Sequence, residues 1–383
     1  MVNDENATIG MLLKSYNEYK AKFTAAEKKI ESEKNNSEAV ADARLEARKN
    51  IQLALGIVLK MKKKFESSVL EDAAFKEDVD NCKLQIELLE KKLELLGSPM
   101  SGIPATSFDD VAGLENVKTA VKDYLFALKN PELAKTYKIE TNIGLLLYGP
   151  PGTGKTLVAE AIAHELGVRF FIITPSHVFG SFVGESERNI REIFAELRAC
   201  VDGAVLLVDE CESIFGKRTS DSNRAAIGVA NQLLQEMNGA TDSGNEKRVI
   251  IGATNRPELI DEAYLRYKRF SLHFHVGMPD IKAIDTLLNI KLAKLPCNPD
   301  LKDAMRRKLS VGYTCADVSN IIAQCSSLAL REHRKLMELG HEVKVVNISV
   351  AHFNEVMKTF NPSVTEKDLE QYAAFEKRSK NSK

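Results

Sequence analysis

The fold of this chain is decided by the stretch Leu145-Leu146-Leu147-Tyr148-Gly149-Pro150-Pro151-Gly152-Thr153-Gly154-Lys155-Thr156. An apolar run leads into G-x-x-x-x-G-K-T, and an amphipathic segment then runs from Lys155 to Leu166 and stops at Gly167. A strand, a glycine-rich turn and a helix in this order are typical of a P-loop. The glycines let successive N–H groups point inward at phosphate oxygens, and the helix directs its N-terminal dipole at the same place. We therefore predict that residues 149–156 bind the phosphates of a nucleotide.

Two side chains of this motif have separate predicted roles. Lys155 supplies a positive charge near the β- and γ-phosphates, and Thr156 offers its hydroxyl to Mg²⁺. The predicted cofactors are therefore ATP and Mg²⁺.

Acidic side chains follow a second apolar run. Val205-Leu206-Leu207-Val208 ends in Asp209 and Glu210, and the carboxyl end of a strand lies beside the P-loop in an open α/β sheet. We predict that Asp209 contributes to the Mg²⁺ site and that Glu210 polarises the attacking water. A third run, Val249–Ala253, leads to Asn255, which we expect to position water or to sense the γ-phosphate.

Short apolar runs alternate with amphipathic helices after residue 104, which favours a parallel sheet covered by helices on both faces. From about Pro279 the pattern is mostly helical and predicts a small all-helical lid domain. The expected strands are Ile143–Tyr148, Val168–Ile173, Ala204–Val208, Val249–Ala253 and Leu272–Val276.

The first 98 residues differ in character from the rest. Residues 1–96 contain no proline, and apolar residues recur at spacings of three and four, which predicts a bundle of three long helices. Proline and glycine then mark residues 99–107 as a linker. We predict the boundaries 1–98 for the helical bundle, 99–107 for the linker, 108–278 for the α/β domain and 279–383 for the lid and the C-terminal helix.

Composition narrows the function classes. The chain has 383 residues, with 53 basic and 54 acidic side chains, so its net charge of −1 argues against a basic nucleic-acid-binding protein. Six scattered cysteines without a CxxC pair predict free thiols in a reducing compartment. No apolar run approaches the roughly 18 residues that a membrane helix needs. We expect a cytoplasmic protein, with a nuclear location as the alternative.

The P-loop, the acidic strand end and Gly252-Ala253-Thr254-Asn255-Arg256-Pro257 together resemble the AAA ATPase family, from Phe108 to about Phe375. The resemblance is to single-ring protein remodellers such as the sorting-complex disassembly ATPase, katanin and spastin, and to the second ring of valosin-containing protein. It implies ATP hydrolysis by a homohexameric ring that acts on protein substrates.

The resemblance also assigns roles to residues outside the three motifs. Val111, Ala112 and Gly113 lie in a segment that lines the adenine pocket in relatives, and Cys315 and Ala316 lie in a lid segment that closes over the base. Cys315 replaces the glycine that is usual there.

Two further stretches match features that work only in a ring. Arg266 and Arg269 match the arginine fingers that reach the phosphates of a neighbouring subunit. Phe182, Val183 and Gly184 match a pore loop that grips polypeptide.

We therefore expect an ATPase that pulls polypeptide through a central pore and is recruited by an unidentified adaptor through residues 1–98. On this hypothesis residues 1–98 are dispensable for ATP hydrolysis. Their nature, a microtubule-interacting and trafficking domain or a coiled coil, stays open, as does whether the ring is permanent or ATP-dependent. The alternatives are a nucleotide-gated scaffold and, less favoured by the charge, a nucleic-acid motor.

Overall fold

The computed structural model describes residues 2–32, 37–68, 75–95, 100–139, 144–180, 184–200, 203–216, 224–241, 248–265, 269–309, 312–339 and 345–381. The chain divides into two compact units. Unit 1 comprises residues 1–104, 166–209 and 218–250, and unit 2 comprises residues 105–165, 210–217 and 251–383. Each unit is described by itself.

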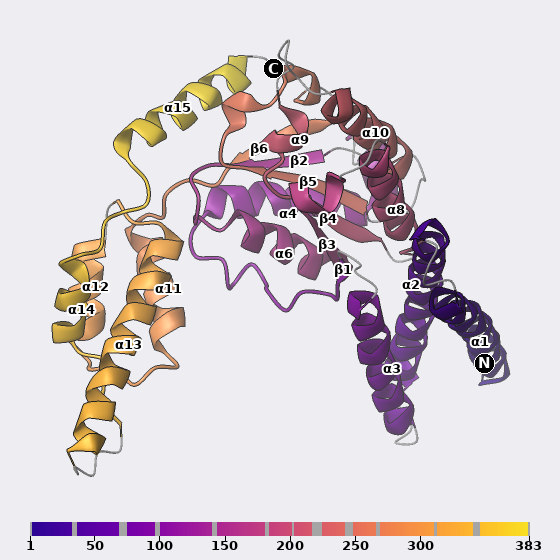
Figure 1. Cartoon of the computed structure of the whole chain (residues 1–383), viewed down its shortest axis with the longest axis horizontal. Helices are drawn as coiled ribbons and strands as arrows, with labels where there is room; N and C mark the ends of the chain where they lie inside the picture. Colours follow the sequence, from indigo (N-terminus) through magenta and orange to yellow (C-terminus); the bar gives the residue numbers. More distant parts are fainter. Residues whose placement is uncertain are drawn as a thin grey trace. The chain divides into compact units, whose positions relative to one another are not determined.

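Three long helices begin unit 1, as the spacing of apolar residues predicts. They are α1 (Val2–Ser32), α2 (Ser37–Ser68) and α3 (Phe75–Leu95), and α2 packs against both of the others (Figure 1). Ala47, Ile51 and Leu55 of α2 are fully buried, which places the heptad seam inside the helical bundle.

The α/β part of unit 1 is built on two parallel strands. Strand β3 (Arg169–Ile173) pairs with β4 (Ala204–Val208), with Phe171 opposite Leu206. Every residue of β4 is buried, which is the pattern of a strand covered on both faces. The helices of this part are α7 (Pro175–Val178), α8 (Glu185–Ala199) and α10 (Arg224–Thr241).

The predicted linker contains a short strand that sequence analysis did not anticipate. Strand β1 (Met100–Ser101) pairs antiparallel with β3, with Met100 opposite Phe171. Two paired residues are too few to produce an alternating pattern, so periodicity could not reveal this strand.

The N-terminal helices pack against the α/β part of unit 1. Helix α2 packs against α8, and the Arg169 side chain at the start of β3 donates to Gln52 Oε1 of α2 at 2.5 Å. Gln52 is 0% exposed and Arg169 is 2% exposed. A buried guanidinium depends on such partners, so α2 stabilises the strand to which it bonds.

Unit 2 contains the strands that carry the P-loop. Strand β2 (Gly144–Tyr148) is parallel to both β5 (Arg248–Thr254, which is shared by the two units) and β6 (Phe270–His275). Leu145, Leu146 and Leu147 are fully buried, as expected for the centre of a parallel sheet. The strand order of the whole sheet is β1-β3-β4-β5-β2-β6, so the prediction of a parallel α/β sheet is confirmed.

The last strand begins two residues earlier than predicted. The expected range was Leu272–Val276, whereas β6 spans Phe270–His275, and an irregularity in its pairing with β2 falls next to Phe270. Such a register shift is set by pairing across the sheet, not by the local apolar pattern.

Helices make up most of the remainder of unit 2. Before and between its strands lie α4 (Glu115–Lys129), α5 (Pro131–Thr136), α6 (Lys155–Leu166), α9 (Glu212–Phe215) and two short 3₁₀ helices, Pro257–Leu259 and Glu262–Tyr264. The predicted all-helical region consists of α11 (Ile281–Leu292), α12 (Leu301–Leu309), α13 (Cys315–Glu338), α14 (Val350–Met357) and α15 (Glu366–Asn381). Helices α11–α14 share a core around Leu288, Met305 and Ile321. Among the described residues, no helix combines the length and apolarity needed to cross a bilayer.

Replacing Gln52 tests whether α2 supports the α/β fold. In Gln52→Ala the buried Arg169 guanidinium loses its side-chain partner, so we expect the free energy of unfolding to fall by about 2–4 kcal/mol. Chemical denaturation followed by circular dichroism measures it. The matched control is Gln85→Ala, whose side chain accepts from Tyr16 Oη at 2.8 Å in a half-buried place, with an expected loss of about 1 kcal/mol or less. Equal losses in the two variants would contradict this account of Arg169.

Candidate functional site

The P-loop of unit 2 is anchored at the carboxyl ends of two neighbouring strands. The Gly149 N–H donates to the Thr254 carbonyl at the end of β5 at 3.3 Å. The Val276 N–H, just after β6, donates to the Tyr148 carbonyl at 2.8 Å. These bonds fix the place at which the chain leaves β2 and begins to curl.

Gly149 itself is required by this anchoring. Its φ is 147°, and a Cβ at this position would lie 2.2 Å from the Val276 carbonyl oxygen. The Thr153 hydroxyl then closes the loop, because its Oγ1 lies 2.9 Å from both the Pro150 and the Val276 carbonyl oxygens. Pro150 is buried beneath the loop and Pro151 is exposed on it.

Lys155 lies inside the loop. Its side chain is 8% exposed, and its Nζ donates to the carbonyls of Gly149 at 2.9 Å and Pro150 at 2.8 Å. The backbone turns at Gly152 and Gly154 with φ values of 72° and 102°. Helix α6 begins at Lys155, as predicted, so a positive charge and a helix N-terminus are held at one place. This arrangement fits a phosphate group.

A cavity of about 490 Å³ lies next to the P-loop in unit 2. Three of the residues predicted to surround the adenine, Ala112, Gly113 and Cys315, line it. Of the other two, Val111 is buried, and the Ala316 N–H donates to the Gly152 carbonyl at 3.0 Å, which joins α13 to the P-loop. The volume and the mixed apolar and polar lining suit a nucleobase.

The segment before α4 approaches this cavity closely because of one glycine. Gly113 has a φ of 69°, and a Cβ there would lie 2.6 Å from the Ala283 Cβ of α11. This position therefore sets the width of the cavity between residues 112–117 and α11.

Several lining residues were missed by sequence reasoning. Asp280 caps α11 by accepting from the Ala283 N–H at 2.7 Å, and this Pro-Asp start of a helix was a readable signal. The spatial proximity of the others to the P-loop comes only from the fold. The missed residues include His275, Met278, Pro279, Asp280, Ala283 and Thr286.

His275 is the titratable group of this cavity nearest to the sheet. Its ring stacks on Tyr148, with centroids 5.2 Å apart. Burial lowers the pKa of His275 below its usual value; Glu376 opposes this shift and the charge of Lys155 adds to it. The imidazole is therefore neutral near pH 7 and adds no charge beside Lys155.

The predicted lid segment forms the start of helix α13. Thr314 and Asp317 form a reciprocal capping box at α13, and the Ser363 hydroxyl donates to the same Asp317 carboxylate at 3.0 Å. Asp317 therefore stabilises the fold of the lid.

Asp209 and Glu210 lie at the end of β4, as predicted. The Asp209 N–H donates to the Ile173 carbonyl at 2.8 Å, so the pairing of β3 and β4 continues to Asp209. Asp209 is the last residue of the 166–209 part of unit 1. Glu210 begins the next part of unit 2 with a φ of 49°, a left-handed conformation that costs a non-glycine residue about 1–3 kcal/mol. Its side chain is exposed.

Asn255 follows β5 and is held through its backbone. The Tyr372 hydroxyl of α15 donates to the Asn255 carbonyl at 2.7 Å, and burial raises the pKa of Tyr372 to about 12. The Asn255 Oδ1 is buried without a hydrogen-bond partner among the described residues. An unsatisfied amide oxygen suits a group that waits for a ligand or a water.

The predicted ring residues are only partly described. Arg269 Nη1 donates to the Ala263 carbonyl at 2.6 Å, and its guanidinium lies 5.9 Å from the Tyr264 ring centroid. Gly184 has a φ of 83° and precedes α8 directly. Arg266, Phe182 and Val183 lie outside the described residues.

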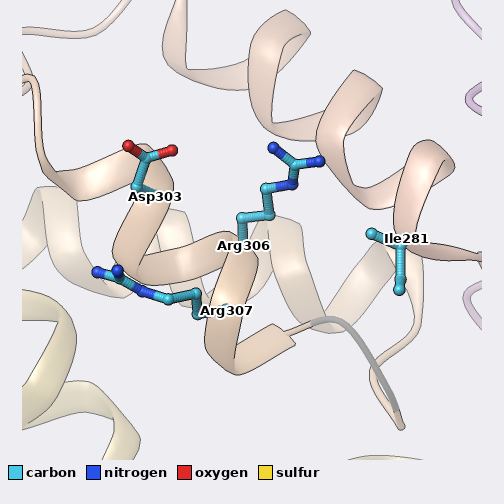
Figure 2. A pocket seen from close by; sticks show the side chains of 4 residues that line it. All are labelled: Ile281, Asp303, Arg306 and Arg307. Carbon is cyan, nitrogen blue, oxygen red and sulfur yellow. The ribbon is translucent and has the colours of Figure 1, made fainter.

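A second cavity, of about 350 Å³, is lined by Ile281, Asp303, Arg306 and Arg307. Figure 2 shows that the two guanidinium groups point in different directions, so they do not form one anion clamp. Arg306 Nε also lies 3.7 Å from Asp285 Oδ1. We assign no function to this cavity.

The sheet, the P-loop and the helical lid define a P-loop nucleotide-binding protein. Residues 145–278 match the model of the ATPase family associated with various cellular activities (AAA). A cell division cycle protein 48 homolog of Archaeoglobus fulgidus is 34% identical over 276 residues, which are 70% of this chain and 37% of that protein. The chain therefore spans well under two thirds of the length of that relative.

Two solved structures of a FIGL-1 AAA domain, one in complex with ADP, are also similar. Both have a TM-score of 0.63 and 26% identity over 73% of this chain; the match covers 92% of the ADP-bound domain and 91% of the other. The chain carries an ATPase domain of the AAA family, homologous to CDC48-like proteins.

Adding one methyl group at Gly149 tests the anchoring of the P-loop. Gly149→Ala forces the loop away from Val276, so we expect nucleotide affinity to fall by about 100-fold or more, measured by calorimetric titration with ADP. The matched control is Gly167→Ala, because Gly167 also has a positive φ, 66°, but no atom lies within 4 Å of the added Cβ. We expect the control to lose about 1 kcal/mol of stability and to bind ADP normally. Loss of binding in both variants would assign the effect to backbone strain alone.

Proposed function

We propose that this protein is a Mg²⁺-dependent ATPase that works as a homohexameric ring and remodels or unfolds protein substrates by pulling polypeptide through a central pore. The observation that carries the proposal is Lys155, which is buried inside the P-loop and donates hydrogen bonds to two loop carbonyls. The P-loop itself is anchored to the ends of β5 and β6. The match to the AAA family supports the same class of activity.

The residues around the P-loop support binding of ATP. The base enters the cavity beside Ala112, Gly113 and Cys315, while residues 149–156 hold the phosphates through backbone N–H groups and Lys155. Thr156 and Asp209 offer oxygen ligands, which Mg²⁺ prefers. When bound, Mg²⁺ neutralises part of the phosphate charge.

Glu210 and Asn255 are the groups that we assign to hydrolysis. Glu210 accepts a proton from the attacking water, and Asn255 orients that water or the γ-phosphate through its side-chain amide. Support comes from the left-handed backbone of Glu210, because backbone strain of this kind clusters at functional sites. A scaffold that only binds nucleotide has less need of such a residue.

The ring assignment rests on resemblance. Arg266 and Arg269 act in trans on the phosphates of the neighbouring subunit, and Phe182, Val183 and Gly184 contact the polypeptide. Arg269 is half-buried and donates to the Ala263 carbonyl, which is compatible with a residue that completes its contacts in an assembly.

We further propose a cytoplasmic location and recruitment of an adaptor through the exposed surfaces of the N-terminal helices. The boundaries 1–98, 99–107, 108–278 and 279–383 remain our proposal for the domains. Neutral charge favours a protein substrate over nucleic acid.

Glu210→Gln tests the hydrolytic role. The amide cannot accept a proton, so we expect ATP binding within about twofold of wild type and turnover reduced by about 100-fold or more. Phosphate release at saturating ATP, together with calorimetric binding, makes the measurement. Wild-type turnover in this variant would remove Glu210 from the mechanism.

The ring is tested by mixing two inactive variants. Lys155→Ala loses ATP binding, and Arg269→Ala binds ATP but hydrolyses it about 1000-fold more slowly, because an arginine finger supplies about that factor. In mixed rings the Lys155→Ala subunit lends its intact Arg269 to a neighbour, so part of the activity returns.

Two controls accompany the mixing experiment. Co-purification of differently tagged variants shows that mixed rings form, and Phe182→Ala should keep hydrolysis while losing substrate processing. If mixed rings form and activity stays at the level of the parents, Arg269 does not act in trans.

A further inference from the structure

Helix α8 presents three charged residues of unit 1 to α2. Arg188, Glu192 and Glu196 are spaced four residues apart and therefore share one helix face. Arg48 of α2 forms ion pairs with two of them: its Nη2 lies 2.8 Å from Glu192 Oε2 and its Nε lies 3.0 Å from Glu196 Oε1.

Along α2, the polar contacts with the α/β part change from solvent-exposed at one end to fully buried at the other. At the exposed end, Arg188 Nη2 donates to Asp42 Oδ1 at 2.8 Å. Glu196, at the other end of the stripe, is 0% exposed. One turn beyond Arg48, Gln52 accepts the Arg169 guanidinium bond, and the Cys200 thiol lies 3.7 Å from the same Gln52 Oε1.

Helix α3 contributes a carboxyl group to the same region. Burial raises the pKa of Glu90, and the positive charge of Arg169 opposes that shift. Arg169 is therefore approached by a polar side chain from α2 and by a carboxyl from α3, and both helices belong to the N-terminal bundle.

A network of this kind specifies one arrangement. Buried charges are costly unless their partners are in place, so α2 can sit against α8 and β3 in only one register. A domain tethered by a flexible linker would make exposed and interchangeable contacts. The first turn of helix α8 is also held in place, because the Gly180 N–H donates to Ser186 Oγ at 3.0 Å.

We propose that α2 positions α8 through Arg48, so that the N-terminal helices and α8 respond as one body and the docking of α2 supports the N-terminal end of α8. Only the effect of this docking on substrate unfolding rests on the proposed function, because α8 follows Gly184, which is predicted to contact polypeptide. The docking itself is independent of ATP hydrolysis.

Hydrogen exchange of the full-length chain tests the docking. In Arg48→Glu we expect amides of residues 185–199 to exchange about tenfold faster or more, relative to those of β2 in the same molecule. Arg48→Gln, a milder change, should give a smaller increase in the same segment. The matched control is Lys92→Glu, which breaks the 2.7 Å pair with Glu27 between α1 and α3 and leaves α8 unchanged. Unchanged exchange of α8 in both Arg48 variants, or equal change in the control, overturns the inference.

A second readout concerns substrate and separates this inference from the proposed function. Arg48→Glu should bind ATP normally and unfold a tagged fluorescent protein with roughly fivefold fewer events per ATP hydrolysed. Faster exchange of α8 with unchanged unfolding per ATP overturns the coupling. If wild-type protein neither hydrolyses ATP nor unfolds the tagged protein, the proposed function fails, and the exchange experiment still decides the docking.

Discussion

The contact between Gly149 and the ends of β5 and β6 is the constraint on which the nucleotide site depends. A Cβ on Gly149 would lie only 2.2 Å from the Val276 oxygen. The backbone hydrogen bonds from Gly149 to Thr254 and from Val276 to Tyr148 hold the chain at this place. Because this anchoring uses backbone groups of a buried parallel sheet, the position of the loop is set by the sheet and not by its own flexible residues. The loop in turn fixes the position of the Lys155 side chain. Its two hydrogen bonds to loop carbonyls keep a positive charge where phosphate oxygens bind.

Local sequence carried much of this information. The bounds of α6 and β4 follow from the glycines and the apolar runs, because short-range patterns determine where such elements begin and end. The three N-terminal helices and the lid were predictable for the same reason. What could not be read depends on residues distant in the chain: the pairing of Met100 with Phe171, the ring of His275 on Tyr148, and the contact of Tyr372 with Asn255. The left-handed backbone of Glu210 could not be predicted either, since glycine is the residue that usually indicates a positive φ in a sequence.

Helix α15 connects the C-terminal region of unit 2 to the site through two contacts of different kinds. Tyr372 holds the carbonyl of Asn255 by a hydrogen bond, and Phe375 packs edge-on against Tyr148, the residue before the P-loop, at 4.9 Å. One helix thus supports both the end of β5 and the end of β2. Because Tyr372 bonds the backbone carbonyl of Asn255, the Asn255 Oδ1, which has no hydrogen-bond partner among the described residues, stays available as an acceptor.

The N-terminal helices raise a question of physical design, since recruitment and docking make different demands on a surface. A domain that only recruits a partner needs no more than a flexible tether to the rest of the chain. Burying Arg169 and Glu196 against such a domain would cost desolvation free energy without helping it to find its partner. Polar groups buried in a complementary network restrict orientation more than they add stability. The network of Arg48, Gln52 and Glu90 therefore suits a bundle whose orientation must be fixed. A fixed orientation is needed if a force or a displacement passes between the helices and the α/β part. In the proposed recruitment an adaptor binds the exposed faces of α1 and α3, so that one bundle meets both demands with different surfaces.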